Sequence, residues 1–230
     1  MRKSISIIIL MVGLFLSKPI RAQEMGVSFS FFFPKNGYFS APISPLSLRG
    51  VGFNITDNLA IETGASLYRM SGMSVTGLPF QTNKPMVGPF FNIMVPVELI
   101  LQFGTNDFEV RFKGGGFVFY NFLTKLNEGN IDREIARYLD VVVAQSRFDF
   151  DNKIGFGYEF GVEYIQYFNR RFGVSIGANY YIGGADLNLR GPVTAASGSG
   201  QLITTNFDFN ESRLDYTGLE ISFGVIFFGR

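Results

Sequence analysis

The chain has 230 residues, with 20 Lys and Arg against 19 Asp and Glu, and it contains neither cysteine nor histidine. The missing cysteine excludes disulfides, thiolate metal sites and cysteine nucleophiles, and the missing histidine removes the usual general base and a common metal ligand. The formal net charge of +1 provides no basic field for nucleic acid. We therefore expect neither an enzyme nor a cofactor.

The N-terminus has the pattern of an export signal. Arg2 and Lys3 precede an apolar run from Ile5 to Leu16, and a short polar stretch ends at Ala22. A membrane-spanning helix needs about 20 apolar residues, and this run is shorter. The pattern predicts a signal peptide over residues 1–22, which directs export through the inner membrane, followed by one domain over residues 23–230.

Eight segments then show a two-residue side-chain alternation, the repeat of a β-strand with differently solvated faces. In the last segment, the odd positions from Leu219 to Phe227 are large and apolar, and mostly small or polar residues separate them. In the fifth, the run Gly114-Gly115-Gly116 predicts a bulge or bend at which the alternation can change face. The predicted strands cover Glu24–Phe33, about Leu48–Ile55, about Leu59–Arg69, Pro89–Gln102, Phe108–Phe122, Lys153–Phe168, Phe172–Gly183 and the segment from Thr217 onward.

Long and short connections alternate strictly between these strands. This pattern predicts an all-β fold, an eight-stranded antiparallel up-and-down transmembrane β-barrel in the outer membrane, with the long loops outside the cell. Ten strands are possible if Leu202–Phe209 adds a hairpin to the wall. Two aromatic girdles are expected, with Tyr68, Tyr120, Tyr180 and Tyr216 at the outer ends and Phe108, Tyr164, Phe172 and Phe227 at the inner ends.

A soluble barrel of the lipocalin kind also has eight up-and-down strands. It would act as a ligand carrier and would need the apolar face inside, around the ligand. The polar face of this chain carries glycine and many charged residues, which do not suit an apolar pocket. Lipid on the outside is therefore the favoured arrangement.

The strand Met94-Val95-Pro96-Val97-Glu98, a short turn, and the strand Val110–Tyr120 with its glycine run resemble a known family. This is the outer-membrane β-barrel domain common in Bacteroidota, the PorT-like group, an OmpA-like barrel without a periplasmic domain. The resemblance spans essentially the whole mature chain. It implies a barrel without a catalytic signature, in a group that includes accessory components of secretion machinery.

The alternation places charged side chains inside the barrel. An eight-stranded barrel is just wide enough to be filled by its own side chains, so a polar plug of ion pairs and hydrogen bonds is the favoured interpretation, and a narrow path for cations or protons is the alternative. Lys153 is a further candidate cation. The interior network is predicted to comprise Glu62, Glu98, Glu109, Arg111, Lys113, Glu159, Glu163 and Glu220.

Glu159 and Glu220 are expected to lie some four residues above Arg111 and Lys113, beyond their direct reach. An unpaired buried charge is costly unless it is hydrated or protonated. We therefore hypothesise that this upper pair shares a proton, is hydrated, or is met by Lys153 or a loop arginine.

The long loop over about residues 123–152 contains an apolar stripe at near-helical spacing. It predicts an amphipathic helix within Asn130–Ala144, with Asn130 as its cap. The stripe either packs against the barrel rim and neighbouring loops or forms a surface for an envelope protein partner. The candidate partner surface consists of Ile131, Ile135, Leu139 and Val142.

These features predict a non-enzymatic outer-membrane barrel, in contact with outer-membrane lipid, that acts as an interaction or accessory component through its extracellular loops. A narrow or gated conduit for ions or small solutes is the second hypothesis.

Overall fold

The computed structural model describes residues 24–38, 47–80, 84–169, 172–196 and 200–228. The predicted signal peptide, residues 1–22, lies outside the described residues.

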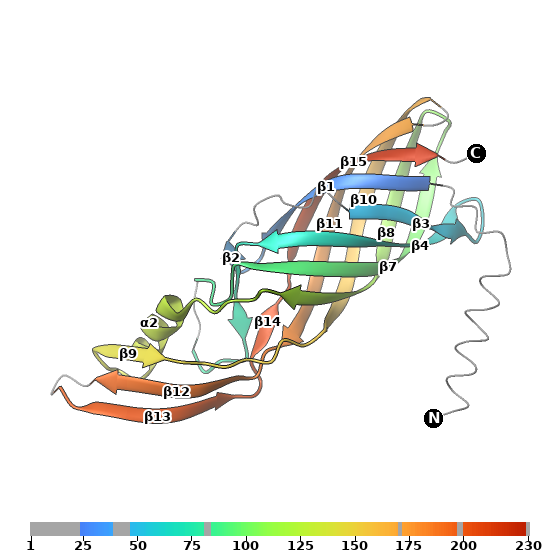
Figure 1. Cartoon of the computed structure of the whole chain (residues 1–230). Coiled ribbons are helices and arrows are strands. Elements are labelled where there is room, and N and C mark those ends of the chain that lie inside the picture. The colour runs from blue at the N-terminus through green and yellow to red at the C-terminus, as the bar shows by residue number, and fades with distance from the viewer. Residues whose placement is uncertain (1–23, 39–46, 81–83, 170–171, 197–199, 229–230) are drawn as a thin grey trace, which may run out of the picture.

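Eight long strands form a closed antiparallel barrel (Figure 1). Each strand pairs with the next long strand along the chain, and the first strand pairs with the last, so the sheet has no free edge. The fold class predicted from the alternation is confirmed. The strands are β1 (Glu24–Pro34), β3 (Ser47–Asn54), β4 (Leu59–Met70), β7 (Phe90–Gly104), β8 (Phe108–Phe122), β10 (Gly155–Asn169), β11 (Phe172–Asp186) and β15 (Gly218–Phe228).

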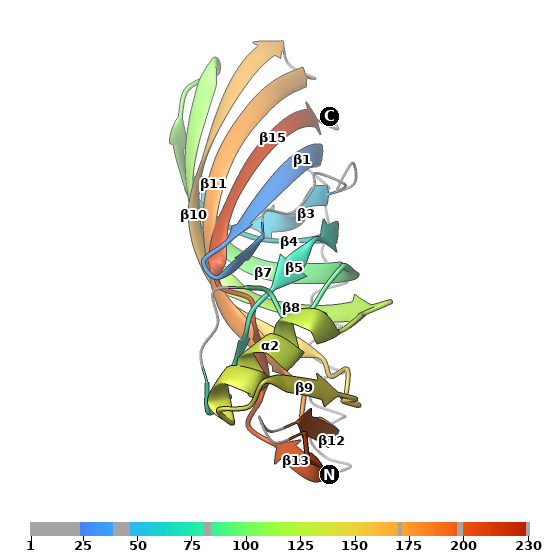
Figure 2. The ribbon, with the colours of Figure 1, turned by 90° about the vertical axis from the view of Figure 1, so that its left-hand side faces the viewer.

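A second sheet and a helix project from the end of the barrel opposite the short turns (Figures 1 and 2). The sheet has the strand order β13–β12–β9, so Leu202–Phe209 does not enter the wall and the ten-stranded alternative is wrong. Small strands extend the rim, where β14 pairs with β11 and β6, and β2 pairs with β5. These elements are α2 (Glu128–Tyr138), β9 (Val143–Ser146), β12 (Leu189–Ala196), β13 (Leu202–Phe209), β2 (Gly37–Tyr38), β5 (Gly72–Met73), β6 (Val75–Thr76) and β14 (Arg213–Asp215).

The outer surface of the barrel wall is apolar. Large side chains such as Val97, Phe112 and Phe160 are exposed, whereas the residues that alternate with them on each strand are buried. A closed sheet with an apolar outer face is suited to lipid, because its strands form backbone hydrogen bonds with one another around the wall. The protein is therefore an outer-membrane barrel, as predicted, and the lipocalin alternative, which needs the apolar face inside, is wrong. Among the described residues, no helix is long and apolar enough to span a membrane.

The predicted aromatic girdles are only partly correct. At the inner end Phe108 and Phe227 are exposed on the wall, and at the outer end Tyr120 is exposed. Tyr68 and Tyr216 are instead buried inside the barrel. Tyr68 occupies an even position on β4, whose even positions point inward, so the alternation itself places it in the interior.

The glycine run of β8 contains no bulge. The register with β7 and with β10 continues without a shift from one end of β8 to the other, so its odd positions face inward throughout. Gly115 allows the regular register between β7 and β8 to continue at this point. A Cβ at this position would lie 2.0 Å from the Val97 carbonyl oxygen, so glycine allows β7 and β8 to approach closely. Register shifts occur instead between Leu48 and Val51 in β3, and between Tyr167 and Asn169 in β10.

Candidate functional site

The half of the barrel interior near the short turns contains buried ion pairs. Lys113 Nζ lies 2.6 Å from Glu163 Oε2, and Arg111 lies 2.5 Å from Glu109 and 3.5 Å from Glu62. Arg111 and Lys113 lie on β8 and Glu163 on the adjacent strand β10, whereas Glu62 lies on β4, which β7 separates from β8. The arrangement is that of a polar plug in which each buried base lies beside at least one acid.

A small cavity of about 20 Å³ lies within this network. Glu62, Arg111, Lys113 and Glu163 contribute to its lining, together with Ser28, whose hydroxyl makes no hydrogen bond to any residue that the structure describes. A cavity of this size holds about one water molecule. This cavity therefore has room for about one molecule of solvent.

Glu220 is held by neutral donors in the half of the interior near the extracellular end. It accepts hydrogen bonds from the Tyr68 hydroxyl, from Asn179 Nδ2 at 3.1 Å and from the Tyr181 hydroxyl at 3.4 Å. The sequence predicted its position but not these donors. Lys153 was wrongly assigned to the interior, because its side chain is exposed just before β10 begins.

The remaining predicted members of the network are also buried. Glu159 points into the upper half of the barrel, and Glu98 lies beside Glu62 in the register of β4 and β7. The structure thus brings Glu62, Glu109, Arg111, Lys113 and Glu163 into direct contacts and places Glu220 in a separate group of hydrogen bonds.

Aromatic side chains fill the interior above the ion pairs. The Tyr216 ring lies 4.6 Å from that of Phe119 and 4.9 Å from that of Phe32, and the Phe117 ring lies 5.1 Å from that of Tyr181. All five side chains are almost fully buried. Phe117 and Phe119 were missed because the glycine run was predicted to be a point at which the alternation can change face. When the alternation continues unchanged through the glycine run, Phe117 and Phe119 lie on the same face as Lys113.

The helix in the third long loop packs against the molecule rather than standing free. Ile131 and Ile135 are only 2 % and 1 % exposed, so the predicted partner surface is wrong for these two residues. The helix begins earlier than predicted, and Asn130 does not cap it but donates a hydrogen bond to the Pro85 carbonyl. It ends before Asp140, whose φ of 53° is left-handed and stops helical propagation.

Leu139 and Val142 lie beyond the helix. Leu139 is partly buried against the core, and Val142 is 72 % exposed. The apolar stripe therefore packs mainly against neighbouring loops, which was the alternative to a partner surface.

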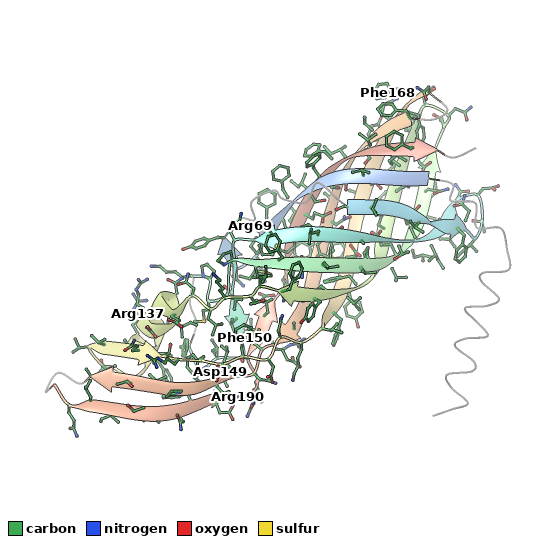
Figure 3. All side chains as sticks on the ribbon, viewed as in Figure 1. Arg69, Arg137, Asp149, Phe150, Phe168 and Arg190 are labelled. Atoms are coloured by element: carbon green, nitrogen blue, oxygen red, sulfur yellow. The ribbon has the colours of Figure 1, made fainter. Side chains whose placement is uncertain are left out.

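The extracellular sheet has an open edge. β13 pairs with β12 alone, and the side chains of residues 202–206 are all exposed. Figure 3 places Arg137, Asp149 and Arg190 at this end of the molecule and Phe168 at the opposite end of the barrel. Among the elements that the structure describes, β13 is the longest strand with one side unpaired.

No family model matches the chain, and no curated protein matches its sequence. Solved structures similar to this chain include the outer-membrane protein OprG from Pseudomonas aeruginosa, with 14% identity, a TM-score of 0.47 and coverage of 90% of this chain and 96% of OprG. A major outer-membrane protein from Thermus thermophilus has 10% identity, a TM-score of 0.44 and coverage of 89% and 98%. Ail, the attachment invasion locus protein of Yersinia pestis, has 7% identity, a TM-score of 0.36 and coverage of 89% and 94%. The likeness concerns the fold alone, and the resemblance to the PorT-like group stays a prediction.

Proposed function

We propose that this outer-membrane barrel is a non-enzymatic interaction component that binds an extended segment of a partner protein along β13. The observation that carries the proposal is the open edge of this eight-residue strand outside the membrane. The role agrees with the accessory function that the resemblance to PorT-like barrels implies.

An open edge strand presents unpaired backbone N–H and C=O groups to any extended chain. Proteins commonly protect such edges with lysine, proline or a bulge. The segment 202–207 has the sequence LITTNF, which contains no charge and no proline, and the register of β13 with β12 is continuous. An unprotected edge of this length is suited to strand addition, in which backbone hydrogen bonds provide affinity.

Apolar side chains gather at the tip of the same sheet. The register aligns Val143, Ala196 and Leu202 in one row across the three strands, and Leu202 is 71 % exposed. Val142 and Ile203, next to this row, are exposed as well. An exposed apolar patch in water is typical of a contact surface. A partner strand with alternating apolar residues would cover this tip while it pairs with β13.

The conduit hypothesis has less support. Ion pairs fill one half of the barrel and the interior aromatic cluster fills the other, so the wall surrounds packed side chains rather than a water path. The extracellular sheet therefore offers the better explanation of what the protein presents to its surroundings.

The test is cross-linked co-purification of the full-length protein from its own outer membrane, with Thr204→Lys compared with Gln145→Lys. Both side chains are exposed and lie in one row of the sheet, on either side of Thr194. Thr204 is on the open edge of β13, whereas Gln145 is on the opposite edge strand, β9, which packs beside helix α2. We expect Thr204→Lys to reduce recovery of a stoichiometric partner by about tenfold, equivalent to about 1.4 kcal/mol of binding free energy. Gln145→Lys is expected to leave recovery unchanged.

Equal recovery with both variants would contradict binding at the edge. Loss in both would place the partner on the face of the sheet instead.

A further inference from the structure

A groove lies on the outer side of the wall where β10, β11 and β14 meet. Its volume is about 300 Å³, and it opens away from the barrel interior. It is separate from β13 and plays no part in the proposed function. The side chains that define its rims are Thr76, Phe156, Tyr158, Ile182, Arg213 and Asp215.

Glycine forms the floor of this groove. Gly157 and Gly183 pair with each other and point inward, where a Cβ on either would meet the ring of Phe117. Gly184, which pairs with Phe156, carries no side chain on the outer face. A Cβ at Gly184 would lie 2.6 Å from the Leu214 carbonyl oxygen and 3.7 Å from Arg213 Nη2. Any side chain here would press on the backbone of β14, so glycine is what allows β14 to lie this close.

The groove is at the height of the extracellular membrane interface. Tyr158 and Phe168 are ten residues apart on β10, and Phe168 lies at the short-turn end of the wall. A residue adds about 2.6 Å of height in a tilted strand, which puts Tyr158 about 26 Å above Phe168. The apolar band of such barrels is about 25 Å tall. The groove therefore faces the headgroups of the outer leaflet.

The two rims of the groove differ in chemistry. One rim is aromatic, with Tyr158 74 % exposed and Phe156 also exposed. The other rim is polar. Arg213 Nε lies 3.1 Å from Asp186 Oδ1, and the neighbouring Asp215 is partly exposed.

The ion pair between Arg213 and Asp186 determines which lipid headgroup fits the groove. The guanidinium of Arg213 is already neutralised by Asp186, and Asp215 adds a negative charge, so the polar rim has no excess positive charge for a phosphate. It does offer N–H donors and carboxylate acceptors side by side, which match the hydroxyl groups of a sugar. An aromatic ring opposite them matches the apolar face of a sugar ring.

We propose that this groove binds the saccharide headgroup of a glycolipid in the outer leaflet. The sugar ring lies against Tyr158, and its hydroxyls bond to Arg213 and Asp215. The acyl chains lie along the apolar wall below, where Phe160 and Val162 are exposed.

The test uses the full-length protein in nanodiscs that contain equal amounts of monoglucosyl dioleoylglycerol and dioleoylphosphatidylglycerol. Native mass spectrometry then measures which lipid stays bound after release from the disc. The two lipids share their acyl chains, so any preference comes from the headgroup. We expect preferential retention of one glucosyl lipid, and a loss of that preference by about tenfold in Tyr158→Ala and in Arg213→Ala.

Two matched variants serve as controls. Tyr164→Ala removes a tyrosine from the same face of β10 nearer the short-turn end, and Arg190→Ala removes an arginine that pairs with Asp151 away from the groove. Both are expected to keep the preference for the glucosyl lipid. Equal retention of the two lipids by the unmodified protein would overturn the proposal, as would an equal loss of preference in the control variants.

Discussion

Lys113 and Glu163 form a close ion pair inside the barrel, and both side chains are almost completely buried. Removing one partner of a buried pair is costly, because the charge that remains loses its compensation in a medium of low dielectric constant. Replacing both partners with apolar groups costs much less. The pair therefore stabilises the barrel as a unit rather than as two independent residues.

We predict that Lys113→Met lowers the free energy of unfolding by about 3–5 kcal/mol and that the double variant Lys113→Met/Glu163→Leu recovers most of this loss. The measurement is urea unfolding of the refolded barrel in lipid vesicles, followed by the shift in gel mobility between folded and unfolded forms. A double variant no more stable than the single one would show that the pair is not the energetic unit.

The alternation correctly predicted that the acidic and basic residues assigned to the interior within the strands point inward, because parity along a strand depends only on local geometry. It was wrong for Lys153, which lies just before β10 begins. It did not predict that Tyr68 and Asn179 would hydrogen-bond to Glu220. Those contacts join β4, β11 and β15 across the barrel, and their geometry depends on the diameter and stagger of the closed sheet.

At the scale of the strand, β8 shows how neighbouring glycines can have different roles. Gly115 points inward, where a Cβ would meet the Val97 carbonyl oxygen at 2.0 Å and Glu98 Cα at 2.9 Å. Gly116 points toward lipid, and a Cβ there would meet nothing closer than the Gly157 carbonyl oxygen at 3.6 Å. One glycine is required by the packing of β7 on β8, and the other is not.

We predict that Gly115→Ala destabilises the barrel by about 1–3 kcal/mol because the new methyl group forces the strands apart. Gly116→Ala is the matched control and is expected to change stability by less than about 0.5 kcal/mol. Folded fractions against urea concentration would measure both effects. Equal stability of the two variants would contradict the assigned roles.

The strand boundaries were predictable to within a few residues, because the two-residue repeat and the turn residues are local signals. The boundaries of helix α2 were less predictable. The apolar stripe continues to Val142, but the left-handed backbone of Asp140 ends the helix, and nothing in the spacing of apolar residues marks that change.

At the scale of the whole molecule, the barrel was predictable and the extracellular sheet was not. Eight alternating strands with alternating long and short connections describe a closed wall. The pairing of β9 with β12 joins two different loops, and no periodic pattern within either loop predicts which segments meet.

We predict that the protein in a planar lipid bilayer produces no steady conductance, because the interior aromatic cluster and the buried ion pairs occlude the lumen. The variant Phe117→Ala/Phe119→Ala removes part of the occlusion and is expected to raise ion leakage. Its control, Phe112→Ala/Val118→Ala, changes lipid-facing positions on the same strand. A steady open state in the unmodified protein would restore the conduit hypothesis.

The pairing of β1 with β15 sets the order in which the fold can be completed. Glu24 pairs with Phe228, so the seam of the barrel joins the first and last strands. During synthesis and export, β1 has no partner on this side until the final strand is present, and the incomplete sheet exposes two edges and an apolar face. The nascent chain therefore depends on protection from aggregation in the periplasm, and insertion into the membrane is coupled to the arrival of its last strand.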